Sequence, residues 1–234
     1  MKTRDVLISG AGIAGPALAY WLSRYGFSPT LVERAPAPRP GGYAVDFRGK
    51  AHLTVLERMG LLEKVRQSST ITGAASYVDR AGRPMVNMPS EVLSGDLEIL
   101  RGDLSRILYD ATRDGAEYVF DDSITAVSQH EDGVDVTFER GARRTFDLVV
   151  GADGLHSRVR ERVFGEEPRF MQHLGYYAAI FTTRNHLGID RSGLFFSVPG
   201  KVAGIYSARD NSEAKALFYF ASSPLAYEHR DLDA

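Results

Sequence analysis

The sequence has no cysteine, which excludes disulfide bonds, thiolate metal sites and cysteine nucleophiles. Its six histidines include no H-x-x-x-H pair, so a zinc site is not expected either. The hydrolase signature G-x-S-x-G and the phosphate-binding signature G-x-x-x-x-G-K-[ST] are both missing. We therefore expect no metal ion and no acid–base triad.

Long hydrophobic runs and an excess of one charge are absent as well. No run approaches the ~18 apolar residues of a membrane span, and Asp5 before the short apolar N-terminal stretch is unlike a signal peptide. The net charge of −2 indicates no general attraction to nucleic acid or to anionic membranes. With 234 residues, 44% of them hydrophobic, the chain is typical of a soluble globular protein of one or two domains. A cytoplasmic protein is the default expectation.

The N-terminus carries the most informative pattern, a buried strand, a glycine turn and a helix start. Gly10, Gly12 and Gly15 fit G-x-G-x-x-G. In this pattern Gly10 permits a tight turn, Gly12 lets a pyrophosphate approach the backbone, and Gly15 lets helix and strand pack closely. The helix N-terminus then offers free N–H groups and a partial positive charge to phosphates.

A second signal supports a dinucleotide site. Glu33 ends a second expected strand, 18 positions past Gly15, where a carboxylate can accept both hydroxyls of an adenosine ribose. We expect this site to hold the adenosine half of FAD rather than NADPH, because Glu33 would repel a 2′-phosphate. The alternative is an ordinary βαβ unit with no ligand. Further candidate cofactor contacts are Ile13, Ala14 and Arg34.

The remaining pattern mixes helical and strand periodicity. Helices are expected at 13–24, 52–67 and 103–113, the last with Asp103 as N-cap, and residues 35–42 form a proline-stiffened loop. A hairpin is expected at 75–88, and four strands over 117–150 end in a buried central strand at 146–150. Strands follow at 176–183, 194–198, 202–208 and 216–221. This predicts an α/β nucleotide domain interrupted by a sheet-rich domain, whose aromatic side chains we assign to a core rather than to a substrate pocket.

Three further segments support the prediction of a dinucleotide site. The first is 147–154, a strand that ends in Gly-Ala-Asp-Gly and is followed by a helix with Ser157 and Arg160. The second is 98–104, with Arg101 just before a helix, and the third is 41–46, which follows Arg39. His156 and the basic run Arg158, Arg160 and Arg162 are interpreted as solvated.

With these motifs the chain resembles, over essentially all its residues, the FAD-dependent aromatic hydroxylases of the p-hydroxybenzoate hydroxylase fold. The nearest branches are the tetracycline-modifying and polyketide monooxygenases. The resemblance implies a Rossmann-like FAD-binding domain (1–74 and 97–165) interleaved with a β-sheet-rich substrate domain (75–96 and 166–234). It assigns Arg101 and Asp46 to FAD, Arg39 to NADPH, and Asp153 and Gly154 to the pyrophosphate and both cofactors. The spacing from Gly42 to Asp46 is one residue longer here than in the tetracycline-modifying branch.

The resemblance also implies the reaction and its partners. NADPH or NADH would reduce FAD, oxygen would add to the flavin, and the flavin hydroperoxide would hydroxylate an aromatic or polyketide-like small molecule. In such an oxidoreductase the cofactor carries the hard step, so no catalytic residue is assigned. A third family motif and a long C-terminal helix are expected beyond residue 234. On that reading the chain is truncated, and we expect apo protein and dimerisation through an exposed sheet surface.

Two other functions stay open. A flavin-dependent halogenase or a flavin reductase has the same fold, but the halogenase signature needs two tryptophans in the second domain and Trp21 is the only tryptophan. A non-catalytic FAD-binding-fold protein is the alternative from a different class. A yellow purified protein would favour the enzyme over this alternative.

Overall fold

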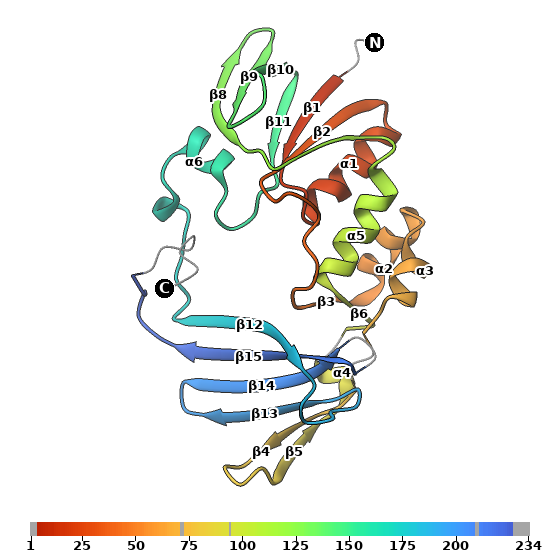
Figure 1. Cartoon of the computed structure of the whole chain (residues 1–234), viewed down its shortest axis with the longest axis vertical. Coiled ribbons are helices and arrows are strands. Elements are labelled where there is room, and N and C mark those ends of the chain that lie inside the picture. Colours follow the sequence, from red (N-terminus) through yellow and green to blue (C-terminus); the bar gives the residue numbers. More distant parts are fainter. Residues whose placement is uncertain (1–3, 71–72, 94, 209–210, 227–234) are drawn as a thin grey trace. The chain divides into compact units, whose positions relative to one another are not determined.

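The computed structural model describes residues 4–70, 73–93, 95–208 and 211–226 (Figure 1). The chain folds as two compact units. The first takes the chain up to residue 41 and then 53–68 and 99–171, while the second takes 42–52, 69–98 and the chain from 172 onward. The α/β class predicted from the sequence is confirmed.

The first unit is built on a parallel four-stranded sheet in the order β11-β1-β2-β7. Its strands are β1 (Arg4–Ser9), β2 (Phe27–Glu33), β7 (Glu117–Phe120) and β11 (Leu148–Gly151). β1 is apolar on both faces, as strands covered on both sides must be. Val6 and Ile8 pack on the side of helix α1 (Ala14–Arg24), whereas Leu7 packs on the opposite side.

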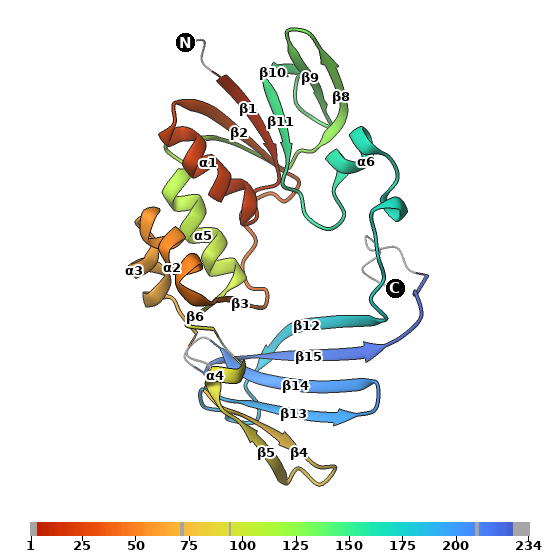
Figure 2. The same cartoon turned by 180° about the vertical axis from the view of Figure 1, so that it is seen from behind.

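Helices and a small sheet cover the two faces of this sheet. α1 packs against β2 and against α5 (Arg101–Thr112), which in turn contacts α3 (Leu62–Gln67). Both cartoon views show α1 and α5 beside the sheet (Figures 1 and 2). The other face meets α6 (Arg158–Phe164) and an antiparallel sheet of β8 (Ile124–His130), β9 (Gly133–Phe138) and β10 (Arg144–Phe146).

Two expected helices differ from the prediction. The stretch 52–67 is not one helix but α2 (Gly49–Arg58) and α3, because Gly60 between them adopts a φ of +68° that interrupts helical backbone. Helix α5 begins at Arg101 rather than at 103, and Leu100 is its N-cap. Asp103 therefore lies in the first turn of α5, where a carboxylate favours the helix dipole without capping it.

The stretch 146–150 is not a buried central strand. It divides at Asp147, whose N–H donates to the carbonyl of Asp5 at 2.9 Å while its carboxylate accepts from the Asp5 N–H at 2.8 Å. The chain thereby leaves the small sheet after Phe146 and enters the parallel sheet as β11. β11 is an edge strand, with Leu148 51% exposed, and residues 117–150 hold five strands rather than four.

The second unit is a six-stranded sheet in the order β12-β15-β14-β13-β4-β5. Its strands are β4 (Ala75–Val78), β5 (Pro84–Met88), β12 (Tyr176–Arg184), β13 (Gly193–Val198), β14 (Lys201–Ala208) and β15 (Glu213–Ala221). All neighbours are antiparallel except β13 and β4. The predicted hairpin and the four later strands are confirmed.

Four short elements were not predicted, namely β3 (Ala44–Phe47), α4 (Ser90–Leu93), β6 (Leu97–Leu100) and the 3₁₀ helix η1 (Glu167–Arg169). β3 and β6 pair in a two-stranded sheet. Assignment of the aromatics to a core is wrong for Tyr176, Phe181, Phe218 and Tyr219, which are 62%, 51%, 44% and 43% exposed. Phe181 and Phe218 stack on one another across β12 and β15. None of the described helices is long and apolar enough to cross a membrane.

Candidate functional site

The turn between β1 and α1 requires its glycines. Gly10 has a φ of +105°, and a Cβ on it would lie 2.5 Å from the carbonyl oxygen of Ala152 in the turn after β11. A Cβ on Gly15 would overlap the carbonyl oxygen of Gly10. The predicted roles of these two glycines, a tight turn and close helix–strand packing, are therefore confirmed.

The N-terminus of α1 presents unused donors. In the described part of the chain, no acceptor bonds the N–H groups of Gly12, Ile13 or Ala14, and the first turn of α1 has no acidic residue. The helix dipole adds about half a positive charge at this end. This arrangement attracts an anion such as a phosphate.

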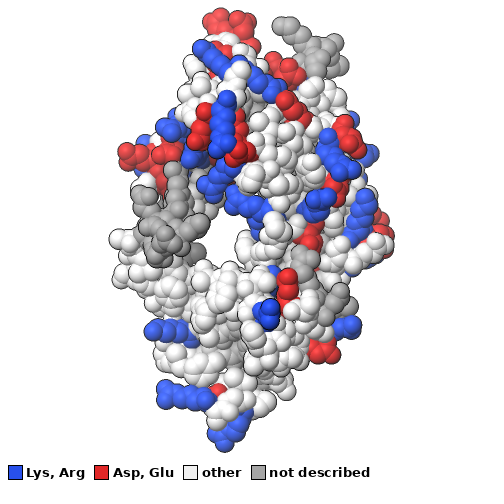
Figure 3. Space-filling model, viewed as in Figure 1, with Lys and Arg blue, Asp and Glu red and all other residues white. Residues whose placement is uncertain are grey.

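A cleft of about 300 Å³ opens at the carboxyl ends of the parallel strands. Ten of the twelve cofactor-binding residues predicted from the sequence line it, and Gly15 lies beneath the turn. The ten are Gly10, Gly12, Ile13, Ala14, Glu33, Arg34, Arg39, Arg101, Asp153 and Gly154. Figure 3 shows cationic and acidic side chains interspersed on one face of the first unit.

Glu33 is firmly held at the end of β2. Its Oε2 accepts the N–H of Ala11 at 3.0 Å, and its Oε1 accepts the N–H of Ala35 at 3.0 Å and Nη2 of Arg39 at 3.1 Å. Burial by itself raises the pKa of Glu33, but the hydrogen bonds from Ala11, Ala35 and Arg39 together outweigh it and hold the pKa below its ordinary value. Glu33 is therefore a carboxylate at neutral pH and can accept hydrogen bonds from hydroxyl groups.

Arg101 places a positive charge at the N-terminus of α5, where the helix dipole is unfavourable for a cation. It is the first residue of α5, and a Cβ on Gly12 would lie 3.1 Å from its Nη2. Within the described residues no hydrogen bond or ion pair engages its guanidinium. The start of α5 is fixed by Gly102, whose N–H donates to Gly41 at 2.7 Å, and by Ser105, whose hydroxyl donates to the carbonyl of Gly12 at 2.9 Å. Arg101 is thus held beside the turn with its charge available to a ligand.

Asp153 has a structural role that the sequence analysis did not predict. Its Oδ1 accepts the hydroxyl of Ser157, and its Oδ2 accepts the N–H groups of Arg158 at 2.8 Å and Val159 at 3.2 Å. Ser157 also caps α6 by accepting the N–H of Arg160 at 3.0 Å. The carboxylate therefore ties the Gly-Ala-Asp-Gly turn to the start of α6.

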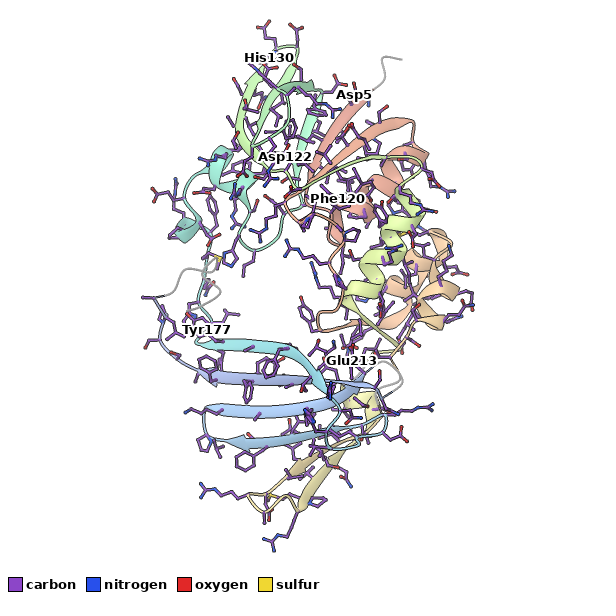
Figure 4. All side chains as sticks on the ribbon, in the orientation of Figure 1. Asp5, Phe120, Asp122, His130, Tyr177 and Glu213 are labelled. Atoms are coloured by element: carbon purple, nitrogen blue, oxygen red, sulfur yellow. The ribbon has the colours of Figure 1, made fainter. Side chains whose placement is uncertain are left out.

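Sequence reasoning missed part of the cleft. Asp122, which is labelled in Figure 4, and Ser123 follow β7, and both line the cleft. Asp122 is buried, and its carboxylate accepts the backbone N–H groups of Arg140 at 3.1 Å and Gly141 at 2.9 Å. The position of Asp122 and Ser123 directly after a strand parallel to β2 is the signal that could have found them.

The interpretation of the basic run as solvated is wrong for two of its members. Arg158 lines the cleft and donates to the hydroxyl of Ser123 at 3.1 Å. Arg160 donates to the carbonyl of Leu155 and is only 26% exposed. His156 is not simply solvated either, since its Nδ1 lies 2.9 Å from the carboxylate of Glu167. These three side chains are therefore bonded to other groups of the protein.

Asp46 lies in the second unit. Its carboxylate accepts the N–H of Gly95 at 3.1 Å and Nη2 of Arg48 at 3.4 Å, and it is not among the residues of the cleft. Asp46 is therefore the one predicted cofactor contact that belongs to the second unit.

The second unit has a pocket of its own, of about 210 Å³. It is lined mostly by apolar and aromatic side chains from the six-stranded sheet, with Glu98 as the one acidic residue among those described: Tyr43, Ala44, Ala75, Glu98, Ile180, Gly193, Phe195, Tyr206, Leu217 and Tyr219. Burial raises the pKa of the Tyr206 phenol, and Glu98 nearby adds to the rise. The Tyr206 phenol therefore stays protonated at neutral pH, and its O–H can donate a hydrogen bond to a ligand.

Comparison with known proteins identifies a family and several relatives that this chain resembles. The family described as FAD binding domain matches residues 3–189. An uncharacterized protein of Mycobacterium tuberculosis is 49% identical over 240 residues, which cover 100% of this chain and 64% of the relative. A flavin-dependent monooxygenase of Legionella longbeachae is 36% identical over 234 residues, which cover 98% of this chain and 60% of the relative.

Solved structures show the same similarity. The crystal structure of tetracycline destructase Tet(55) matches with a TM-score of 0.86 at 38% identity, over 98% of this chain and 59% of that one. The chain therefore spans about three fifths of the length of these relatives.

Proposed function

This chain belongs to the FAD binding domain family, and on that premise we propose that the cleft of its first unit binds the adenosine and pyrophosphate parts of FAD. One observation carries the proposal. The cleft combines Glu33, an acceptor for ribose hydroxyls, with the N–H groups that begin α1 and the guanidinium of Arg101, neither of which has a partner among the described residues. The first two lie at the ends of adjacent parallel strands, as adenosine followed by pyrophosphate requires. Arg34, Arg39, Asp153 and Gly154 complete the proposed contacts.

The whole protein would be a monooxygenase that uses FAD, NADPH or NADH, and oxygen. Bound FAD would supply the redox chemistry, while this chain would bind and orient the cofactor. We assign the second unit to substrate binding, because its pocket offers aromatic walls together with Tyr206 and Glu98 as hydrogen-bonding groups. A volume of about 210 Å³ suits one or two fused rings, such as a phenolic compound or part of a polyketide. The relatives named as flavin-dependent monooxygenases and the tetracycline destructase support this reading.

Titration of the purified protein with FAD, followed by flavin fluorescence, tests cofactor binding. Wild-type protein should bind FAD, and Glu33→Ala should weaken binding by roughly tenfold or more, because charge-assisted hydrogen bonds contribute about 1.5–3 kcal/mol. Unchanged FAD affinity in Glu33→Ala would refute the assignment of Glu33 to the ribose. NADPH oxidation in the presence of FAD, stimulated by members of a phenolic and polyketide panel, tests the reaction.

A further inference from the structure

Glu33 has one acceptor position fewer than a ribose diol needs. A carboxylate oxygen accepts about two hydrogen bonds. Oε1 already accepts two, from the N–H of Ala35 and from Arg39, and Oε2 accepts one, from the N–H of Ala11. In the part of the chain that the structure describes, one position is left, on Oε2, whereas the two hydroxyls of a ribose need two.

Only one of the three bonds to Glu33 can be given up easily. Ala11 and Ala35 donate through backbone N–H groups that belong to the glycine turn and to the end of β2. Arg39 donates through a long side chain that is 52% exposed, from a loop without helix or strand. Release of Arg39 moves no backbone and frees a guanidinium that is already half in solvent, so the Arg39 bond is the one most easily given up.

We infer that Arg39 is a latch on Glu33, which occupies the acceptor position of the second ribose hydroxyl and is displaced when adenosine enters the cleft. This inference rests on the proposed binding of FAD. Displacement exchanges an ion pair for two hydroxyl–carboxylate hydrogen bonds. It also releases the Arg39 guanidinium at the wall of the same cleft, where it can face the phosphates. With Arg39 in place, the hydrogen bonds to Glu33 hold its pKa below the ordinary value, so the latched carboxylate is ionised.

Adenosine is the appropriate probe because it carries the ribose diol and no charge. In Arg39→Ala the acceptor is free, so adenosine should bind about two- to fivefold more tightly than to wild type, measured by calorimetric titration. Arg66→Ala is the matched control, since Arg66 is equally exposed at 52%, pairs with Glu63 and does not line the cleft. In a Glu33→Ala background, Arg39→Ala should change nothing.

The dependence of adenosine affinity on ionic strength gives a second measurement. Salt screens the Arg39–Glu33 pair but leaves uncharged adenosine unaffected. Adenosine affinity of wild type should therefore rise with salt, and that of Arg39→Ala should not.

Two results would overturn the latch. If FAD binds but Arg39→Ala binds adenosine no better than wild type, or less well, Arg39 is a ligand contact or a bystander and the FAD site stands. If neither wild type nor Arg39→Ala binds FAD, the proposed function and the latch fail together.

Discussion

Replacing Arg101 by alanine should weaken FAD binding while leaving the fold intact. In the proposed complex Arg101 faces the pyrophosphate, and a charge-assisted hydrogen bond of this kind contributes about 1.5–3 kcal/mol. Its loss corresponds to a dissociation constant raised roughly 10- to 100-fold. The effect should be largest at low ionic strength, because part of the attraction is unscreened charge.

The same substitution should change stability very little. Arg101 has no carboxylate partner among the described residues, so Arg101→Ala leaves no buried anion behind. A cation at the first residue of α5 is also disfavoured by the helix dipole, by about 0.3–1 kcal/mol. We therefore expect a free energy of unfolding within about 0.5 kcal/mol of wild type, or slightly above it.

Flavin fluorescence titration and urea unfolding of the same preparations separate the two effects. Arg106→Ala is the matched control, because Arg106 lies on the same helix, pairs with Asp110 at 3.1 Å and does not line the cleft. FAD affinity of Arg106→Ala should equal that of wild type. The reasoning is refuted if Arg101→Ala binds FAD within twofold of wild type, or if it loses affinity only because it unfolds.

Three further substitutions test the architecture of the cleft. Gly15→Ala should destabilise the protein by about 1–3 kcal/mol or more, seen as a lower midpoint of thermal unfolding, because its Cβ would overlap the carbonyl of Gly10; an unchanged midpoint would show that α1 can shift freely. Asp153→Ala should cost about 0.5–2 kcal/mol in urea unfolding through the lost cap of α6, and full stability would mean that Ser157 caps the helix unaided. The lowered pKa of Glu33 implies stability that is present above its ordinary value of 4.5 and is lost as pH falls through the folded pKa. Wild type should accordingly exceed Glu33→Gln in unfolding free energy at neutral pH, with a gap that narrows as the pH falls below 4.5; a gap independent of pH would contradict the shift.

The features predicted best were those that depend on neighbours in the chain. Gly10 and Gly15 are needed by one short turn, and the hairpin at β4 and β5 follows from alternation and a turn signal. The break between α2 and α3 is also a local feature, at Gly60, but it was not predicted. In the sequence, a glycine that ends a helix looks the same as a glycine that a helix tolerates.

The wrong predictions concern places where segments distant in the sequence come into contact. Periodicity showed 146–150 to be an apolar strand, but the bonds between Asp5 and Asp147 place its two halves in different sheets. Alternation likewise showed that Phe181 and Phe218 lie on one face of a sheet, and it carried no information on whether a second layer covers that face.

The sequence by itself determined the α/β class, the glycine turn and the acidic residue at the end of β2, because each is encoded within one βαβ unit. Only the tertiary structure decided that Arg101 lies beside Gly12 with no partner among the described residues, that Asp122 and Ser123 line the same cleft, and that Arg39 bonds Glu33. The physical reason is that parallel strands bring their carboxyl ends to one edge whatever their separation in the chain. Which side chains meet there, and which charges are left without a partner, follows from strand order and packing rather than from any local pattern.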